Sequence, residues 1–398
     1  MTDFLRPETP EEVAEAIRDA KAPINIEGGG GLKGLGRVAG EGGTLKTDRL
    51  KGVIEYSPTE LYVTFAAGTT LTDAKATLAE KNQRLPFDPP DLTHLYGASG
   101  PATVGGVAAS GLSGPSRVAS GAVRDFLIGV KFVDGVGQAM HGGGRVMKNV
   151  TGYDLCKISA GAMGTLGVLT EVTFKVLPNA VAERTLAVQG LDDFAGQAAM
   201  SAALKTPFEP VSAAHLPASV AGRIQGLSHS SHTLIRFEGF PDSLDYRTEA
   251  IRRNLPAENI ISFEGEVSAA IWEAVRDASP FHQQDDRSLW RISTSPTKGP
   301  ALVEKLGDLG GEAFYDWAGG LIWLALPADL ADAGATKIRS AVTAAGGHAT
   351  LIRGSEVVRA TVDVFQPLDP VVMKLTKGLK DVFDPKGLLN PGRMYAEV

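Results

Sequence analysis

The stretch INIEGGGGLKGLGR, residues 24–37, decides the first half of the fold. Four consecutive glycines, Gly28 to Gly31, directly follow a short apolar segment that predicts a β-strand. Glycine adopts positive φ at little cost, so the N–H groups of successive glycines can converge on one anion. The stretch therefore predicts either a phosphate-binding loop or a flexible surface loop, and these residues alone favour neither.

The same loop contains the spacing of a nicotinamide-dinucleotide fingerprint. Gly29, Gly31 and Gly34 match G-x-G-x-x-G. That fingerprint needs a helix directly after the loop, because the helix N-terminus binds the pyrophosphate. The residues that follow, LGRVAGEGGTL, contain more glycine and no apolar periodicity. This context argues against a nicotinamide-binding domain.

A second glycine- and serine-rich stretch, residues 97–122, favours the phosphate-binding interpretation. Gly105 and Gly106 permit close approach of a ligand to the backbone, and hydroxyl groups recur along the stretch at Thr103, Ser110, Ser113 and Ser116. Two separate loops of this kind predict a long phosphate-bearing ligand that is held at several points. Packing of small residues remains the alternative.

Composition limits the class of protein. A chain of 398 residues predicts two or three domains, and a net charge of −7 argues against a nucleic-acid partner. The single cysteine, Cys156, excludes a disulfide framework, an iron–sulfur cluster and a cysteine-based zinc site, and we expect a buried, inert thiol. The N-terminus lacks signal-peptide features, and the apolar runs fall short of the ~20 residues that span a bilayer. We expect a cytoplasmic protein that reaches the inner membrane only through a partner.

Local patterns predict an α+β fold rather than regular βαβ alternation. At the N-terminus, Thr9 is a helix cap, Pro10 is the first helical residue and Glu12 completes a capping box. After Pro178 the glycine clusters stop, and two blocks follow that each predict a βαββαβ unit.

The C-terminal residues predict a capped helix and a turn. Asp369 is the cap and Pro370 the first helical residue. The helical spacing puts one set of apolar residues on one face, with lysines elsewhere; the set is Val372, Leu375, Leu379 and Val382, and the lysines are Lys374, Lys377 and Lys380. The closing GLLNPGRMY predicts a specific turn, and we expect this tail to dock on the body of the protein.

Six motifs in a fixed order carry a family resemblance. They are GGGG (28–31), PFDPP (86–90), GPATVGGVAASGLSGPSR (100–117), RDFLIGVKFVDG (124–135), GGRVMKNVTGYDLCKISAGAMGTLGVLTEV (143–172) and FDPKGLLNPGRMY (383–395). Together they resemble the vanillyl-alcohol-oxidase-type (PCMH-type) FAD-binding family and, within it, are most similar to the FAD-binding E subunits of glycolate oxidases. The resemblance implies a two-lobed PCMH-type FAD-binding domain at residues 1–178. It also implies a ferredoxin-like-derived α+β substrate or cap domain at 179–360, and a segment at 361–398 that docks on the FAD domain.

The resemblance also implies roles for individual residues. The FAD pyrophosphate would be held by the first loop, namely Gly28, Gly29, Gly30, Gly31 and Leu32. The pyrophosphate and ribityl chain would be lined by Ser99, Thr103, Val104, Gly105 and Gly106, and the flavin by Ser110 and Gly114. The adenosine part would meet Gly167 and Val168, and the cofactor would also contact Asn149. From the tail, Asn390 would reach the isoalloxazine, with Pro391 forcing Asn390 into an extended conformation.

The candidates for catalysis are Lys148 and Asn390. Lys148, beside Asn149, would place a cation near the flavin and stabilise its anionic reduced form, although an exposed loop lysine is the alternative. Arg236, Arg291 and Arg353 could bind a substrate carboxylate, although ion pairing is the more common role for such residues.

Two departures from the family pattern matter. The first loop has no histidine, so the resemblance implies a non-covalent FAD. No metal-binding G-H-x-G-D-G-N-x-H segment is present, and we expect the pair His229 and His232 to be solvated rather than a metal site.

The resemblance implies a function within a complex. The chain would be the FAD-binding subunit of a glycolate (2-hydroxy-acid) oxidase. Its partners would be a small 2-hydroxy-acid substrate, a second flavoprotein subunit and a cysteine-rich iron–sulfur subunit that receives the electrons. A standalone FAD-dependent alcohol or 2-hydroxy-acid oxidase, and a non-catalytic flavin-binding assembly subunit, remain open as alternatives.

Overall fold

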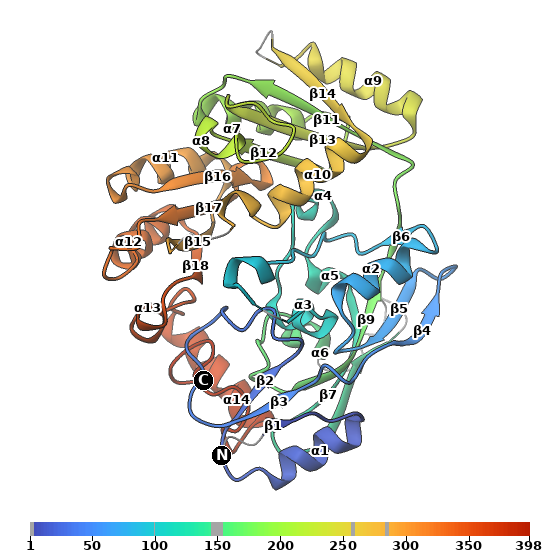
Figure 1. The fold of residues 1–398 in the computed structure, drawn as a ribbon, viewed down its shortest axis with the longest axis vertical. Helices are drawn as coiled ribbons and strands as arrows, with labels where there is room; N and C mark the ends of the chain where they lie inside the picture. The colour runs from blue at the N-terminus through green and yellow to red at the C-terminus, as the bar shows by residue number, and fades with distance from the viewer. Residues whose placement is uncertain (1–3, 99, 145–153, 256–258, 283–285) are drawn as a thin grey trace. The chain divides into compact units, whose positions relative to one another are not determined.

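The computed structural model describes residues 4–98, 100–144, 154–255, 259–282 and 286–398. The chain forms two compact units, and each is described by itself. Unit 1 contains Met1–Ser113, Ala122–Asn179 and Pro367–Val398, and unit 2 contains Gly114–Gly121 and Ala180–Gln366. Both units combine helices with strands, so the predicted α+β class is confirmed (Figure 1).

Three sheets organise unit 1. A five-stranded antiparallel sheet has the order β4-β5-β9-β7-β8, a parallel sheet has the order β1-β3-β2, and β10 pairs with β6. The described strands of this unit are β1 (Phe4–Leu5), β2 (Ile24–Glu27), β3 (Gly43–Lys46), β4 (Val53–Ser57), β5 (Tyr62–Ala66), β6 (Gln83–Arg84), β7 (Leu127–Val133), β8 (Ala139–Gly143), β9 (Val168–Lys175) and β10 (Leu177–Pro178). The helices are α1 (Pro10–Asp19), α2 (Leu71–Ala79), the 3-10 helix η1 (Thr93–Tyr96), α3 (Val104–Ser110), α5 (Val123–Phe126), α6 (Leu155–Ser159) and α14 (Pro370–Phe383).

The core of unit 1 lies between the five-stranded sheet and helices α2 and α3. Val172 and Phe174 of β9 point to the same face of the sheet, as the two-residue period of a strand requires, and both belong to this core. Phe87, from the PFDPP motif, is also fully buried, and its ring lies 5.6 Å from that of Phe174. This motif therefore anchors the chain between β6 and η1 to the core.

Helix α1 begins as the sequence predicts, but one detail of its capping differs. Thr9 Oγ1 accepts a hydrogen bond of 3.2 Å from the N–H of Glu12, and Pro10 is the first helical residue. The Glu12 carboxylate accepts from the N–H of Glu8 at 2.7 Å rather than from that of Thr9. The prediction of a capping box is therefore right for the Thr9 side chain and wrong for the Glu12 side chain. The chain before the cap brings the N–H of Glu8 within reach of Glu12 instead.

The sequence context predicts that no helix follows the first glycine loop, and the structure agrees. Residues 28–42 form turns and bends that lead to β3, which pairs with β2 in parallel. The second glycine-rich stretch was predicted to be a loop, but part of it is helical. It contains the helix α3, which starts because the Thr103 side chain accepts a hydrogen bond from the N–H of Gly106 at 3.2 Å.

Unit 2 is built on one eight-stranded sheet with the order β14-β11-β13-β12-β16-β17-β15-β18. Its strands are β11 (Ala182–Gln189), β12 (Ser212–Leu216), β13 (His232–Gly239), β14 (Ile260–Glu264), β15 (Ser288–Ser293), β16 (Glu312–Asp316), β17 (Leu321–Leu326) and β18 (His348–Arg353). Its helices are α4 (Arg117–Ser120), α7 (Asp193–Leu204), α8 (Ala218–Ala221), α9 (Pro241–Arg252), α10 (Gly265–Arg276), α11 (Gly299–Lys305), α12 (Ala335–Ala345) and α13 (Glu356–Thr361), with the 3-10 turns η2 (Ser279–Phe281), η3 (Pro296–Lys298), η4 (Gly307–Leu309) and η5 (Trp317–Gly319).

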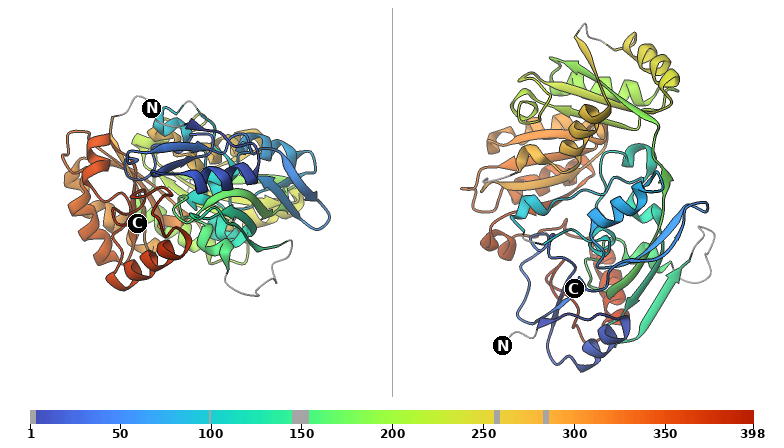
Figure 2. Two further views of the ribbon diagram at one scale, coloured as in Figure 1. Left: turned by 90° about the horizontal axis from the view of Figure 1, so that it is seen from below. Right: turned by 45° about the vertical axis from the view of Figure 1, so that its right-hand side comes forward.

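The strand order reveals two related halves in unit 2. Numbered within each half, the first reads 4-1-3-2 and the second reads 2-3-1-4, so the halves meet at β12 and β16. The two halves are the green-to-yellow and orange parts of this unit (Figure 2). Each half has the ferredoxin-like βαββαβ order, and the prediction of two such blocks is confirmed.

The C-terminal tail belongs to unit 1. Helix α14 starts at Pro370, and Asp369 accepts a hydrogen bond from the N–H of Val371 at 2.9 Å, as predicted. After the helix, the red tail segment returns to the blue N-terminal strands (Figures 1 and 2), where the N–H of Ile24 donates to the carbonyl of Leu388 at 2.7 Å. Within the described ranges, no helix combines the length and apolar character needed to cross a membrane.

Candidate functional site

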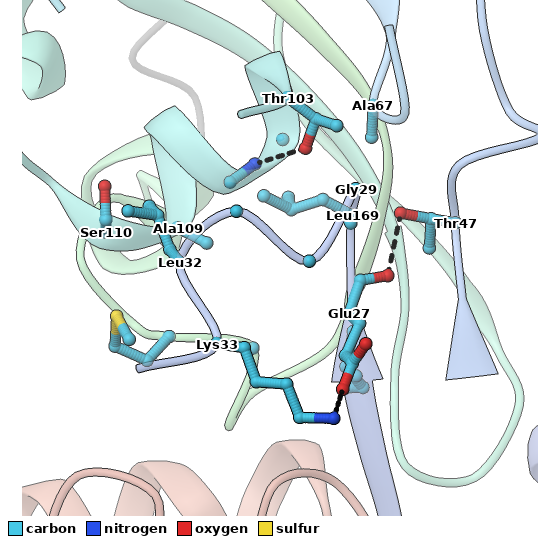
Figure 3. A pocket seen from close by; sticks show the side chains of 18 of the residues that line it. Glu27, Gly29, Leu32, Lys33, Thr47, Ala67, Thr103, Ala109, Ser110 and Leu169 are labelled. Carbon is cyan, nitrogen blue, oxygen red and sulfur yellow. Dashed lines mark hydrogen bonds and ion pairs between the residues drawn. The ribbon is translucent and has the colours of Figure 1, made fainter. Parts of the chain in front are cut away.

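A pocket in unit 1 brings together distant parts of the chain (Figure 3). It is lined by the end of β2 and the loop after it, by Thr47 after β3 and Ala67 after β5, by the segment that leads into α3 and α3 itself, by the segment before β9 with Leu169 of that strand, and by the tail. Most residues that the sequence predicts for the cofactor lie here, namely Gly28, Gly29, Gly30, Gly31, Leu32, Thr103, Gly105, Gly106, Ser110, Gly167 and Asn390. The fold thus assembles residues that are separated by more than three hundred positions in the sequence.

The glycines of the first loop are required by close packing between loops. A Cβ atom on Gly28 would lie 2.4 Å from Thr103 Oγ1, and one on Gly29 would lie 2.2 Å from the Pro101 carbonyl oxygen. At Gly31 the same atom would lie 2.9 Å from the backbone nitrogen of Ala102. Distances this short are not tolerated between atoms that are not bonded. The first loop therefore lies directly on the segment that leads into α3, and side chains would separate the two.

The same loop offers backbone donors to the pocket. Within the part of the chain that the structure describes, the N–H groups of Gly29, Gly30, Gly31 and Leu32 have no hydrogen-bond acceptor. Gly30 has φ of 92°, a conformation that favours glycine. Partly buried N–H groups without an acceptor are costly unless water or a ligand accepts from them. Successive N–H groups of this kind suit the oxygens of a phosphate or pyrophosphate.

The first turn of α3 contributes space rather than donors. The N–H of Gly105 donates to the Ala67 carbonyl at 2.8 Å, and that of Gly106 donates to Thr103 Oγ1. Of the atoms that the structure describes, a Cβ on Gly106 would meet only Thr103 Oγ1, at 3.3 Å, so this glycine leaves an opening on the pocket side. Nearby hydroxyls are also engaged, because Ser110 Oγ donates to the Val107 carbonyl at 3.1 Å. In this arrangement the donors of the pocket come mainly from the first loop.

Asn390 connects the tail to two other walls of the pocket. Its Oδ1 accepts from the N–H of Ile26 at 2.7 Å, and its Nδ2 donates to the Met163 carbonyl at 2.7 Å. Its φ of 43° is left-handed, so the predicted extended conformation is wrong. Asparagine tolerates this region, and its side-chain hydrogen bonds hold the turn despite the following Pro391. The second N–H of Nδ2 is the one remaining donor that the side chain can offer to a ligand.

Two positively charged residues at the pocket, Lys33 and Arg393, were not predicted. Arg393 Nη2 donates to the Lys33 carbonyl at 2.9 Å, and the N–H of Arg37 donates to the Arg393 carbonyl, so the tail holds the first loop in place. Lys33 Nζ lies 3.0 Å from Glu27 Oε1 and is largely exposed (Figure 3). A pairing of this kind contributes little to stability, which leaves Lys33 free to turn towards an anion. The sequence signal for Arg393 was its place in the NPGR motif.

Other predicted residues lie outside this pocket. Val104 and Val168 are fully buried in the hydrophobic core, and neither lines the pocket. Gly114 belongs to unit 2, where its carbonyl accepts a hydrogen bond from Trp317 Nε1 at 2.9 Å. Ser99, Lys148 and Asn149 lie outside the described residues. The candidate site therefore consists of the pocket residues alone.

Cys156 and His232 are buried in structural positions. The Cys156 thiol faces the Gly142 carbonyl at 3.6 Å, and burial raises its pKa to about 11, so the prediction of an inert thiol is confirmed. His232 was expected to be solvated, but it is fully buried. Its Nδ1 lies 2.8 Å from the Ser230 carbonyl oxygen and its Nε2 lies 3.1 Å from Gln189 Nε2, because β13 carries it into the sheet.

The three candidate arginines of unit 2 have different surroundings. Arg236 pairs with Glu183 at 2.6 Å and with Glu238 at 3.2 Å, and Arg353 donates to the carbonyls of Arg287 and Phe281. Both are therefore structural. Arg291 lies over the ring of Trp317, 4.8 Å from its centroid, and no carboxylate lies within salt-bridge distance of it in the described residues. Of the three, Arg291 is the one suited to bind an anion.

Comparison with known proteins agrees with the site. A family model described as an FAD binding domain matches residues 3–143. Glycolate oxidase subunit GlcE of Escherichia coli is 37% identical over 390 residues, which cover 98% of this chain and 97% of that protein. Glycolate oxidase subunit GlcD of Bacillus subtilis is 24% identical, with 99% of this chain and 88% of that protein covered.

Solved structures share the fold. A p-cresol methylhydroxylase with substrate bound has a TM-score of 0.75 at 15% identity and covers 99% of this chain and 88% of its own. An alkyldihydroxyacetonephosphate synthase has a TM-score of 0.67 at 16% identity, and the match covers 98% of this chain and 75% of that protein. These likenesses show a PCMH-type fold, and the near full-length match to GlcE shows the family. The chain belongs to the glycolate oxidase subunit GlcE family of FAD-binding oxidoreductases.

Proposed function

We propose that this chain is the FAD-binding subunit of a glycolate oxidase complex. In this complex, glycolate or a related 2-hydroxy acid is oxidised to the 2-oxo acid, and the electrons leave through FAD to an iron–sulfur subunit. The observation that carries the proposal is the pocket lined by the first loop, whose N–H groups at residues 29–32 have no acceptor among the described residues, in a chain that matches GlcE over nearly its whole length. With one cysteine, this chain needs another subunit to supply an iron–sulfur cluster.

The pocket residues fit FAD. The N–H groups of residues 29–32 would bind the pyrophosphate, and Lys33 is close enough to turn its charge towards it. Gly106 would leave room for the cofactor beside α3, and Asn390 would offer its remaining N–H. The Arg393 side chain would keep the first loop closed on the tail. When bound, FAD supplies the capacity to take two electrons from an alcohol carbon and release them singly.

Arg291 and its neighbours would supply the substrate carboxylate with a positive field. Arg117 lies 4.3 Å from the centroid of the Trp317 ring, on which Arg291 also stacks. Burial and the charge of Arg117 lower the pKa of Arg291 to about 10. The guanidinium therefore stays protonated at neutral pH, although burial and repulsion make its charged form less favourable. Partial burial and the charges of Arg291, Arg117 and Arg339 likewise lower the pKa of His348. The charge of Asp316 already favours the charged form of Arg291, and a bound carboxylate would add to this effect.

Replacement of Arg291 tests this assignment. In the assembled enzyme, we expect Arg291→Met to raise KM for glycolate by about 30-fold, which corresponds to about 2 kcal/mol for a charged hydrogen bond. FAD content should be unchanged. The matched control is Arg253→Met, since Arg253 is exposed and pairs only with Glu249 in the described residues. Equal KM values for both variants would contradict the role of Arg291.

Anaerobic reduction tests the function itself. The purified chain, loaded with FAD, is mixed with glycolate alone and then together with the other subunits of the complex. Loss of the visible flavin absorption only with those subunits supports the proposal. Loss with the chain alone would identify a standalone oxidase. If the assembled complex bleaches equally well when this chain carries no flavin, the chain is an assembly subunit.

A further inference from the structure

Helix α14 turns its apolar residues outward. The side chains of Val371, Leu375, Leu379 and Val382 follow at intervals of four, four and three residues, so they form one stripe along the helix. Their exposed fractions are 67%, 65%, 39% and 73%. Val372 extends the stripe with 46% exposed. A helix on the surface of a globular protein normally turns such a stripe towards the core. Single exposed apolar residues are common on protein surfaces, but a continuous exposed stripe is not.

The helix cannot bury this stripe by rotation, because polar contacts fix its opposite side. Lys380 is buried and lies 2.8 Å from the fully buried Asp384 carboxylate. Its ammonium also donates to the carbonyls of Thr165 at 2.8 Å and Leu389 at 2.6 Å. Phe383 is also buried, and its ring centroid lies 5.9 Å from that of Phe132, with the two rings tilted by 55°. The outward direction of the stripe is therefore built into the fold of unit 1.

Gly378 lies in the middle of the exposed stripe, and the described residues give no reason for a glycine there. A Cβ at this position would meet none of their atoms within 4 Å, and its φ is not in the left-handed region. Glycine within a helix is unfavourable relative to alanine. Close approach of a second backbone is the usual reason for such a glycine. This observation points to a partner that packs directly on the helix.

The charges beside the stripe indicate the chemistry of the partner. Lys374 lies next to it and has no ion pair in the described residues, and Lys377 pairs with Glu397 near the chain end. The stripe contains only aliphatic side chains and glycine, whereas helices that lie on membranes usually place aromatic residues on the apolar face. A protein with an apolar face and acidic residues at its rim fits this surface better than a lipid bilayer does.

The buried side of α14 leads directly to the cofactor pocket. Lys380 binds the Leu389 carbonyl, and the next residue, Asn390, lines the pocket. A partner on the outer face would thus be separated from the pocket wall by little more than the ~10 Å diameter of one helix. That position suits a subunit that exchanges electrons with the cofactor.

We propose that the outward face of α14, formed by Val371, Val372, Leu375, Gly378, Leu379 and Val382, is the docking surface for the electron-exchanging subunit of the oxidase complex. The docked subunit presents an apolar face with acidic residues around it. This inference rests on the proposed function, because it takes the chain to work in a complex with a redox partner.

Variants of the stripe test the docking surface. The full chain is co-expressed with the other oxidase subunits, as wild type, as Leu375→Asp/Leu379→Asp and as Gly378→Leu. We expect both variants to reduce the partner recovered with the chain by at least about tenfold, as for central interface residues. FAD content of the isolated chain should be unchanged, because Leu375, Gly378 and Leu379 do not line the cofactor pocket. Gly378→Leu should not lower the thermal stability of the isolated chain, since glycine is the less favourable residue within a helix. The control is Val267→Asp, which alters an apolar side chain on α10 that is 49% exposed.

The outcomes separate this inference from the function. If the variants recover the partner as the wild type does, the docking surface is wrong and the proposed function stands. If the wild type itself recovers no partner subunit, the proposed function fails. Binding of the isolated wild-type chain to vesicles of anionic phospholipid, lost in the variants, would instead identify a membrane surface. A dimer of the isolated chain that the variants dissociate would identify a second copy as the occupant. Both of these results overturn the proposal.

Discussion

Replacement of Gly106 with leucine is expected to abolish retention of FAD while the chain still folds. Among the described residues, the Cβ of residue 106 would meet only Thr103 Oγ1, and Gly106 lines the pocket, so we expect the added side chain to extend into it. There it competes with the cofactor for the same space. We expect the dissociation constant for FAD to rise by at least about 100-fold, which corresponds to about 2.7 kcal/mol. Titration of the apoprotein by quenching of flavin fluorescence measures it.

The control for this variant is Gly40→Leu. A Cβ on Gly40 would have no described atom within 4 Å, and this glycine has no positive φ and does not line the pocket. We expect FAD affinity within about twofold of the wild type for this control, since surface substitutions have small effects. Tight binding of FAD by the Gly106→Leu protein would show that the cofactor does not pass beside α3.

Replacement of Lys380 with methionine is expected to destabilise unit 1 strongly. The change leaves the fully buried Asp384 without its cation, 2.8 Å away in the wild type, and leaves two carbonyls without a donor. Removal of one partner of a buried ion pair costs about 3–5 kcal/mol. In a unit of this size the midpoint of thermal unfolding should fall by at least about 6 °C. Release of flavin fluorescence on heating reports it.

The matched variants for this prediction lie on the same helix. Lys374→Met removes an exposed lysine of α14 and should leave the midpoint within about 2 °C. Lys380→Met/Asp384→Asn removes the uncompensated charge and should recover part of the loss. A midpoint for Lys380→Met equal to that of Lys374→Met would mean that the buried pair does not hold the tail.

The order of motifs predicts the fold because each motif has a local physical signature. The glycine run after a strand, the βαββαβ periodicity and the Asp-Pro start of α14 depend only on neighbouring residues, and the structure agrees with all three. The helix α3 was missed because VGGVAAS contains two glycines, which argue against a helix when taken alone. The cap on Thr103 and the buried Val104 and Val107 stabilise it in the folded protein.

Contacts between distant segments could not be predicted from the sequence. The use of Arg393 to hold the first loop depends on how the tail returns to β2, which no local pattern encodes. The left-handed Asn390 depends likewise on hydrogen bonds to Ile26 and Met163. In α14 the pattern predicts an apolar face but not its direction. The buried pair of Lys380 and Asp384 decides that direction, and a lysine is rarely expected inside.

The amount and attachment of flavin in the purified chain test the central claim most directly. The chain is purified, supplied with FAD, freed of excess ligand and denatured with acid, and flavin is measured in the supernatant and in the precipitate. The account predicts FAD bound at one equivalent per chain and released completely into the supernatant, because the loop of residues 28–37 offers backbone contacts and no histidine. A colourless protein after incubation with FAD, or flavin that stays with the precipitate, would contradict it.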